Sequence, residues 1–280
     1  MRTTIPVGAA LLTLGFLAAS CSRQAEQSPA AAASSPAAGP SAAAAAPSPA
    51  DTAAPDAPRG VKESNELIDF EYSYPDAAGA IPSLKAVLDA EMDKRKAELV
   101  ANAKEIQAES KQEDFPYHRL ASETLWQVVT DLPGWLSLSA TIGEDQGGAH
   151  PNHGYDALLW DKQANQRRKV TDLFTSKAAF TRAIGKGFCA ALDRQRKEKR
   201  QGEDGGGGII DDFGKCIDPA GTTVILGSSN HQTFDRIGWL IGPYEAGSYA
   251  EGDYEITLPV TAAVIAAVKP EYRAVFSVRR

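Results

Sequence analysis

The feature that most restricts folding is a tract, residues 22–60, that contains no bulky apolar residue. Ala, Pro and Ser make up almost all of it, so it has no apolar surface with which to offset the entropy lost on folding. Segments of this composition are typical of flexible or extended tethers. We therefore predict a disordered linker over residues 22–60 and a folded part over residues 61–280, enough for one large domain or two small ones.

Residues 1–21 have the order of a bacterial export signal. Arg2 supplies a positive charge, and residues 5–17 form an uncharged stretch rich in Leu, Ala and Gly. This stretch is shorter than the about 20 residues of a membrane-spanning helix. The small residues before Cys21 resemble a lipobox, with Ala18 where Leu is usual. We expect lipidation of Cys21 and an exported lipoprotein at the outer membrane, facing the periplasm; the alternative is an ordinary signal with an incidental cysteine.

The net charge indicates which classes of partner suit this protein, and the two remaining cysteines indicate its cellular compartment. The formal net charge is −7, which argues against nucleic acid and suits a cationic protein. Two further cysteines, Cys189 and Cys216, form an even pair. In an oxidising periplasm such a pair most simply forms a disulfide, and a redox role is disfavoured because no C-x-x-C spacing occurs.

Periodicity in the folded part predicts an α+β fold with antiparallel mixed sheets. Residues from Pro82 onward have apolar side chains at spacings of three, four or seven, which predicts one long amphipathic helix. Ser176 caps a second predicted helix, and Asp131 to Gly134 form the turn of a hairpin. We divide the folded part into α+β subdomains at 61–162 and 163–280. Strands are predicted at 67–74, 120–130, 135–142, 155–160, 223–226, 233–241 and 254–259.

Three clusters in fixed order resemble a known module. They are Gly-Gly-Ala-His-Pro-Asn at 147–152, Val-Thr-Asp-Leu-Phe at 170–174, and Ile-Gly-Pro-Tyr-Glu-Ala-Gly at 241–247 with Tyr-Ala-Glu-Gly-Asp at 249–253. Together they resemble a paired module of unknown function in the lysozyme-sensing anti-sigma-V factor and in the N-terminal region of a peptidoglycan deacetylase. The resemblance covers residues 67–273, and residues 163–280 resemble the lysozyme-binding part.

The resemblance implies a binding module for a lysozyme-like cationic protein or a peptidoglycan fragment. It does not imply deacetylation, because this sequence shows no appended deacetylase domain. The contact candidates all lie on the shared loops. They are His150, Asn152, Tyr244, Glu245 and Tyr249. An alternative is that these loops are only turns, with Tyr244 buried as an anchor.

We predict no catalytic residues, no metal site and no cofactor. Pro151 prevents a helix that would bring His150 and His153 to one face, and neither a G-x-S-x-G nor an S-x-x-K motif occurs. Two alternatives stay open: a structural envelope lipoprotein, and a peptidoglycan-modifying hydrolase with a carboxylate site. The carboxylates considered for the hydrolase are Glu251 with Asp253, and Asp211 with Asp212.

Overall fold

The computed structural model describes residues 59–202 and 211–279, all within the compact unit Ala53–Arg280. The predicted signal peptide at 1–21, the lipidation candidate Cys21 and residues 22–58 of the predicted linker lie outside the described residues. No helix in the described ranges has the length and apolarity needed to cross a lipid bilayer. The α+β fold with mixed sheets and one long helix is confirmed.

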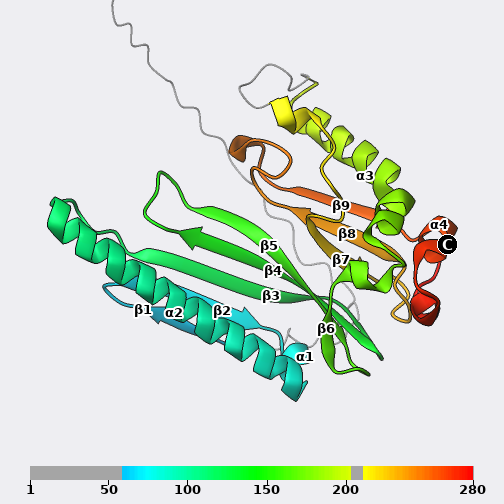
Figure 1. The fold of residues 1–280 in the computed structure, drawn as a ribbon, viewed down its shortest axis with the longest axis horizontal. Helices are drawn as coiled ribbons and strands as arrows, with labels where there is room; N and C mark the ends of the chain where they lie inside the picture. The colour runs from blue at the N-terminus through cyan, green and yellow to red at the C-terminus, as the bar shows by residue number, and fades with distance from the viewer. Residues whose placement is uncertain (1–58, 203–210, 280) are drawn as a thin grey trace, which may run out of the picture. The chain divides into compact units, whose positions relative to one another are not determined.

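The first half of the described chain forms a six-stranded sheet with the strands in sequence order (Figure 1). Neighbouring strands are antiparallel except β2 and β3, which run parallel because α2 crosses over between them. The predicted hairpin is the β3–β4 pair. The strands are β1 (Arg59–Ser64), β2 (Ile68–Tyr74), β3 (Leu120–Leu132), β4 (Trp135–Asp145), β5 (Asn152–Asp161) and β6 (Gln166–Arg168).

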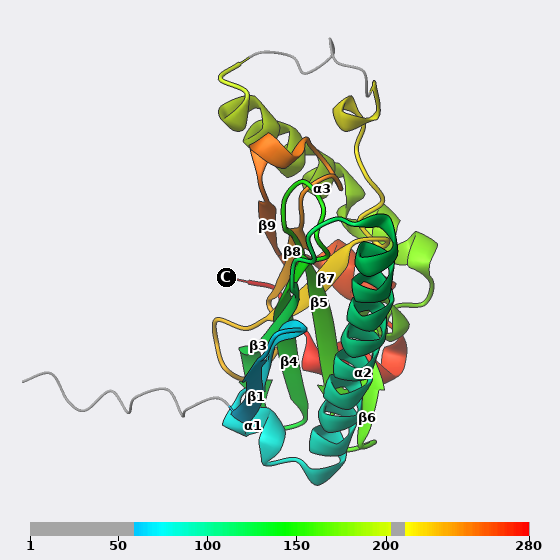
Figure 2. The ribbon, with the colours of Figure 1, turned by 90° about the vertical axis from the view of Figure 1, so that its left-hand side faces the viewer.

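One face of this sheet is covered by α2 (Pro82–Glu113), which follows the short α1 (Asp76–Gly79) and contacts β2 and β3 (Figure 2). Leu84, Leu88 and Leu99 are buried against aromatic side chains of β2. Burial of such a side chain contributes about 1.5–3 kcal/mol, so this seam holds the helix on the sheet. Val87 belongs to the predicted apolar stripe but is 38% exposed, so it lies at the edge of the seam.

The second half forms a three-stranded antiparallel sheet in the order β7-β8-β9, covered by α3. Ser176 caps α3 as predicted, because its Oγ accepts a hydrogen bond from the amide of Ala179 at 3.0 Å. Cys189 on α3 forms a disulfide with Cys216, which confirms the predicted pairing. The elements are α3 (Lys177–Lys199), β7 (Thr223–Gly227), β8 (Arg236–Ile241), β9 (Tyr254–Pro259) and α4 (Ala262–Ala267), with 3-10 helices Val170–Leu173, Asp211–Gly214, Tyr249–Glu251 and Pro270–Val275.

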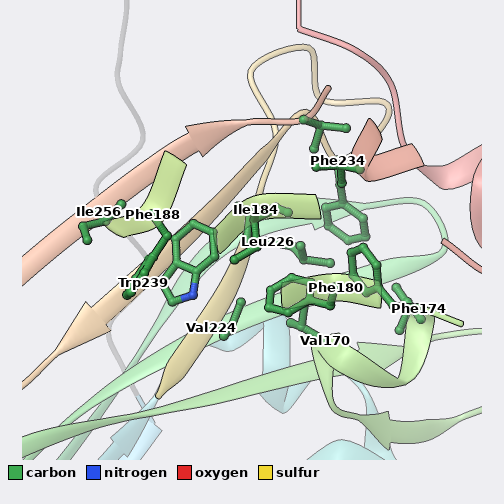
Figure 3. Packing of buried hydrophobic residues seen from close by; sticks show 14 of the residues in the cluster. Val170, Phe174, Phe180, Ile184, Phe188, Val224, Leu226, Phe234, Trp239 and Ile256 are labelled. Atoms are coloured by element: carbon green, nitrogen blue, oxygen red, sulfur yellow. The ribbon is translucent and has the colours of Figure 1, made fainter. Parts of the chain in front are cut away.

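Trp239 lies at the centre of the core between α3 and the second sheet (Figure 3). It is fully buried, contacts the rings of Phe180 and Phe188, and donates from Nε1 to the carbonyl oxygen of Pro219 at 2.9 Å. This packing buries Phe180, Ile184 and Phe188 of α3 in the same core. Strand β7 also contacts β3, β4 and β5, so the two sheets share an interface.

Two strands, β1 and β6, were not predicted; β6 has only three residues, all of them polar. Strand β1 begins at Arg59 and includes Lys62 and Ser64, whose polar side chains give no apolar alternation. It is the edge strand of its sheet, where polar residues are common because one side of the strand remains free. Strand β1 forms because it pairs with β2, whose sequence alternates strongly, and not because of apolar alternation in its own sequence.

Candidate functional site

The loop between β4 and β5 presents His150 to solvent. Gly147 adopts a φ of 76°, and its amide donates to the carboxylate of Asp145 at 3.0 Å, which turns the chain back toward β5. The exposed His150 ring donates from Nδ1 to the carbonyl oxygen of Pro151 at 2.9 Å. A carbonyl oxygen only accepts, so Nδ1 bears a proton in this arrangement, and in the neutral ring Nε2 is then an acceptor.

The loop between β8 and β9 presents Tyr244 in an uncommon backbone conformation. Its φ is 68°, a left-handed conformation that costs a non-glycine residue about 1–3 kcal/mol and often marks a functional position. The turn is closed by the Tyr244 amide, which donates to the carbonyl oxygen of Gly247 at 3.1 Å. The side chain is 49% exposed, so the alternative of a buried anchor is wrong.

Tyr249, from the 3-10 helix Tyr249–Glu251, joins the two loops. Its ring centroid lies 4.2 Å from that of His150 and 5.7 Å from that of Tyr244, with interplanar angles of 36° and 33°. Its hydroxyl donates to the carbonyl oxygen of Pro151 at 3.0 Å, and the Tyr244 hydroxyl lies 3.4 Å from Nε2 of His150. We call His150, Tyr244 and Tyr249 the His150–Tyr249 cluster.

Glu251 holds the loop beneath this cluster. Its carboxylate accepts from the amide of Ser248 at 2.9 Å, from Nε of Arg200 at 2.9 Å, and from the hydroxyl of Tyr254. Burial by itself would raise its pKa, but the hydrogen bonds from Tyr254, Ser248 and Arg200 outweigh burial and lower the pKa of Glu251 to about 2. Glu251 is therefore ionised, and its hydrogen bonds hold the loop in place.

Arg196 on α3 anchors the same loop from below. Its side chain is buried, and Nε and Nη2 donate to the carbonyl oxygen of Ala246 at 2.9 and 2.8 Å, while Nη1 donates to the carbonyl oxygen of Lys215 at 2.9 Å. Lys199, one turn further along, donates to the carbonyl oxygens of Glu251 and Asp253. The last turns of α3 thus fix the main chain that positions Tyr244 and Tyr249.

A hydrogen-bonded pair next to the cluster connects the two sheets. Nε2 of His153, on β5, lies 2.7 Å from the carboxylate of Asp253, which precedes β9. Tyr155 lies against the same carboxylate. The pKa of the Tyr155 phenol is raised mainly by burial and, to a smaller extent, by the hydrogen bond with Asp253. Asp253 is therefore already occupied by two neighbours.

The remaining predicted contact residues behave differently from the cluster. Glu245 accepts from the amide of Gly242 at 2.9 Å and from the Thr222 hydroxyl at 2.7 Å, so its carboxylate holds the turn. Asn152 is exposed at the start of β5, and its register partner is Glu144. Whether any of these residues binds a partner stays a prediction.

A separate cavity of about 360 Å³ lies between β5, β6 and the start of β7. Most of its charged side chains already have partners: Arg167 lies 3.3 Å from Asp156, and Arg168 lies 3.5 Å from Asp161. Glu245, at its rim, accepts hydrogen bonds as described above. These interactions engage four of the five charged side chains in the lining, with Lys169 the exception, so the His150–Tyr249 cluster is the stronger candidate.

The residues considered for chemistry are engaged in the structure. Glu251 accepts a hydrogen bond from Arg200, and Asp253 is hydrogen-bonded to His153, so each of these carboxylates already has a partner. Asp211 lies in a 3-10 helix, and the side chains of Asp211 and Asp212 lie outside the described residues. In the described ranges, no three His, Cys, Asp or Glu side chains gather as metal ligands would.

Comparison with known proteins supports the deacetylase part of the resemblance, whereas the link to the anti-sigma-V factor stays a prediction. Residues 61–153 match the family model described as deacetylase PdaC. The matched segment covers less than half of the chain and ends at His153, the strand residue paired with Asp253. A search of curated proteins gave no match.

Two solved structures from the DUF3298 family have a similar fold. A protein from Pseudomonas aeruginosa PAO1 is 15% identical, with a TM-score of 0.51, over 81% of this chain and 99% of that chain. A protein from Bacteroides fragilis NCTC 9343 is 16% identical, with a TM-score of 0.46, over 72% and 89% of the two chains. At this identity the first likeness shows the fold alone.

Proposed function

We propose that this protein is a lipid-anchored binding module of the cell envelope that recognises a cationic protein of the lysozyme type. The observation that supports this most is the exposed His150–Tyr249 cluster, built from two loops that meet although about a hundred residues separate them. Tyrosine is enriched at interface hot spots because its ring supplies contact area at low entropic cost and its hydroxyl supplies a hydrogen bond.

The framework under the cluster favours binding. Arg196 and Glu251 hold the loop by buried, charge-assisted hydrogen bonds, so the rings are ordered before a partner arrives. Preorganised contacts strengthen association because less side-chain and loop entropy is lost on binding. The left-handed conformation of Tyr244 supports a contact role, since a glycine would close the turn with less strain.

The charge of the chain supports a cationic partner. The net charge is −7, and the groove beside Tyr249 is lined by Glu123 and Asp145. An acidic face accelerates association with a basic protein such as lysozyme by electrostatic steering. A peptidoglycan fragment, whose sugars could stack on the same rings, is the competing ligand and forms a separate arm of the test.

The test is calorimetric titration of the purified full chain with lysozyme and, separately, with muropeptides whose masses are followed over time. We expect saturable binding of lysozyme and unchanged muropeptides. Tyr249→Ala should weaken lysozyme binding at least about tenfold, as hot-spot truncations do. The matched control is Phe115→Ala, which removes an exposed aromatic ring (42% exposed) from the loop between α2 and β3.

Three results would contradict the proposal. Absence of lysozyme binding removes its central claim. Muropeptide binding that depends on Tyr249 assigns the cluster to a glycan instead. A time-dependent mass change in the muropeptides indicates an enzyme and directs attention to the carboxylates.

The lipid anchor is tested separately. Cys21→Ser should move the protein from the membrane fraction to the soluble fraction of the expressing cells and abolish incorporation of a labelled fatty acid. Normal acylation of the variant would show that Cys21 is not the lipidated residue. Loss of the anchor should leave lysozyme affinity in solution unchanged, because the His150–Tyr249 cluster lies on the folded part.

A further inference from the structure

A glycine creates a hollow on the face of the first sheet that α2 leaves uncovered. Glu123 on β3, Gly143 on β4 and His153 on β5 are neighbours in register, so their side-chain positions form one row across the sheet. Gly143 has no side chain, and a Cβ there would meet only Glu123, at 3.7 Å, which is ordinary contact. The row therefore has a gap between a carboxylate and an imidazole.

The gap belongs to a pocket of about 310 Å³ that Tyr249 of the His150–Tyr249 cluster helps to line. This volume is at the lower end of the range for small-ligand sites. It suits a single long side chain that enters beside the ring of Tyr249. The pocket is continuous with the proposed binding surface because Tyr249 contributes to both.

The charged side chains that line the pocket are mainly carboxylates. Glu123 and Asp145 line it, and neither forms a salt bridge with a lysine or arginine within residues 59–202 and 211–279. Lys62, on the same sheet, lies 2.5 Å from the carboxylate of Glu71 and is engaged there. Among the described residues, Glu123 and Asp145 therefore have no ion-paired lysine or arginine, although Lys62 lies close enough to interact electrostatically with Glu123.

We propose that the hollow over Gly143 receives a lysine or arginine side chain of the bound protein. The cation lies between the carboxylates of Glu123 and Asp145 and against the ring of Tyr249, combining ion pairing with a cation–π contact. This inference rests on the proposed function, because it names the chemical group of the cationic partner that the acidic surface of this protein selects. It also explains why a strand position in the middle of the sheet is occupied by glycine.

Two variants and two matched controls test the inference in lysozyme binding by the full chain. Gly143→Val fills the hollow with a residue that strands favour, and Glu123→Gln removes one charge with little change in shape. Each should weaken binding about tenfold, the range of a central interface contact. The first control, Gly154→Val, changes a residue of β5 that pairs with Ile142, and a Cβ at Gly154 meets nothing within 4 Å. The second control, Glu109→Gln, removes an exposed charge from α2. Both control variants should bind lysozyme normally.

A small-molecule probe separates this inference from the proposed function. Nα-acetyl-lysine amide and Nα-acetyl-arginine amide should shift the backbone amide NMR signals of Gly143 and Glu123, and the shifts should disappear in Gly143→Val. Nα-acetyl-norleucine amide, the uncharged counterpart of the lysine probe, should leave them in place. The probes report on the pocket whether or not lysozyme is the partner.

The outcomes are distinguishable. Normal lysozyme affinity in Gly143→Val and Glu123→Gln, with weakened affinity in Tyr249→Ala, would overturn the inference and leave the proposed function intact. Shifts from the cationic probes without any lysozyme binding would support the pocket and contradict the proposed partner. Equal shifts from the norleucine probe, or none from any probe, would overturn the inference.

Discussion

Replacing Glu251 by glutamine should destabilise the protein in a pH-dependent way. The carboxylate accepts three kinds of hydrogen bond, from a backbone amide, a guanidinium and two hydroxyls, and its side chain is 16% exposed. Glutamine keeps the size but loses the charge and turns one acceptor into a donor that faces Arg200 or Tyr254. The ionised form is the one that the folded protein stabilises.

The size of the effect follows from the pKa. A pKa of about 2 in place of the ordinary 4.5 corresponds to about 3 kcal/mol of unfolding free energy. Because the folded pKa is lowered, this stabilisation is fully present above pH 4.5 and is lost as the pH falls toward 2. The free energies of unfolding of the natural protein and Glu251→Gln should therefore differ by about 3 kcal/mol at pH 7 and converge near pH 2.

Urea denaturation at a series of pH values measures this difference. Asp89 and Asp235, whose pKa values are also lowered, titrate in both chains and cancel in the comparison. Glu109→Gln, an exposed change on α2, controls for the loss of one charge and should stay within about 0.5 kcal/mol of the natural protein. A difference between Glu251→Gln and the natural protein that is constant from pH 7 to pH 2 would refute the electrostatic account of Glu251.

Three further changes test other parts of the framework by urea denaturation at pH 7. Replacing both Cys189 and Cys216 by alanine opens a link of sequence separation 27 and should cost about 3–4 kcal/mol in the chain-entropy model; a loss below 1 kcal/mol would contradict it. Arg196→Met leaves the carbonyl oxygen of Ala246 buried without its donors and should cost about 2–3 kcal/mol and weaken lysozyme binding, whereas unchanged affinity would show that the loop needs no anchor. Phe188→Ala, beneath Trp239, should cost about 3–5 kcal/mol without altering the pH dependence.

The elements that sequence reasoning predicted are those with strong local periodicity. Phe180, Ile184 and Phe188 repeat every four residues, and all three are buried on α3. Strand β2 alternates buried and half-buried residues throughout, as its sequence indicates. The disulfide was predictable because Cys189 and Cys216 are the two cysteines left after Cys21.

Features that depend on contacts distant in sequence were not predictable. The hydrogen bond between His153 and Asp253 joins residues one hundred positions apart, and the sequence gives no signal for it. The exposed, left-handed Tyr244 depends on the turn closed by Gly247 and on the main chain held by Arg196. A sequence pattern reports which side chains are apolar, but it does not report which loops meet.

The position of the candidate site explains why neither half of the chain is sufficient for it. The segment that matches the PdaC family model supplies Glu123, Gly143 and His150, but Tyr249 and Asp253 come from the second half. The alignment with the Pseudomonas aeruginosa structure covers nearly all of that structure, so the fold that brings these residues together is shared. The candidate site, in contrast, depends on the identity of a few side chains in the loops and the pocket. Since identity to that structure is 15%, the fold can persist while the side chains that select a partner change. If the proposed function is correct, Gly143, Tyr244 and Tyr249 select the partner of this chain, and the fold itself does not.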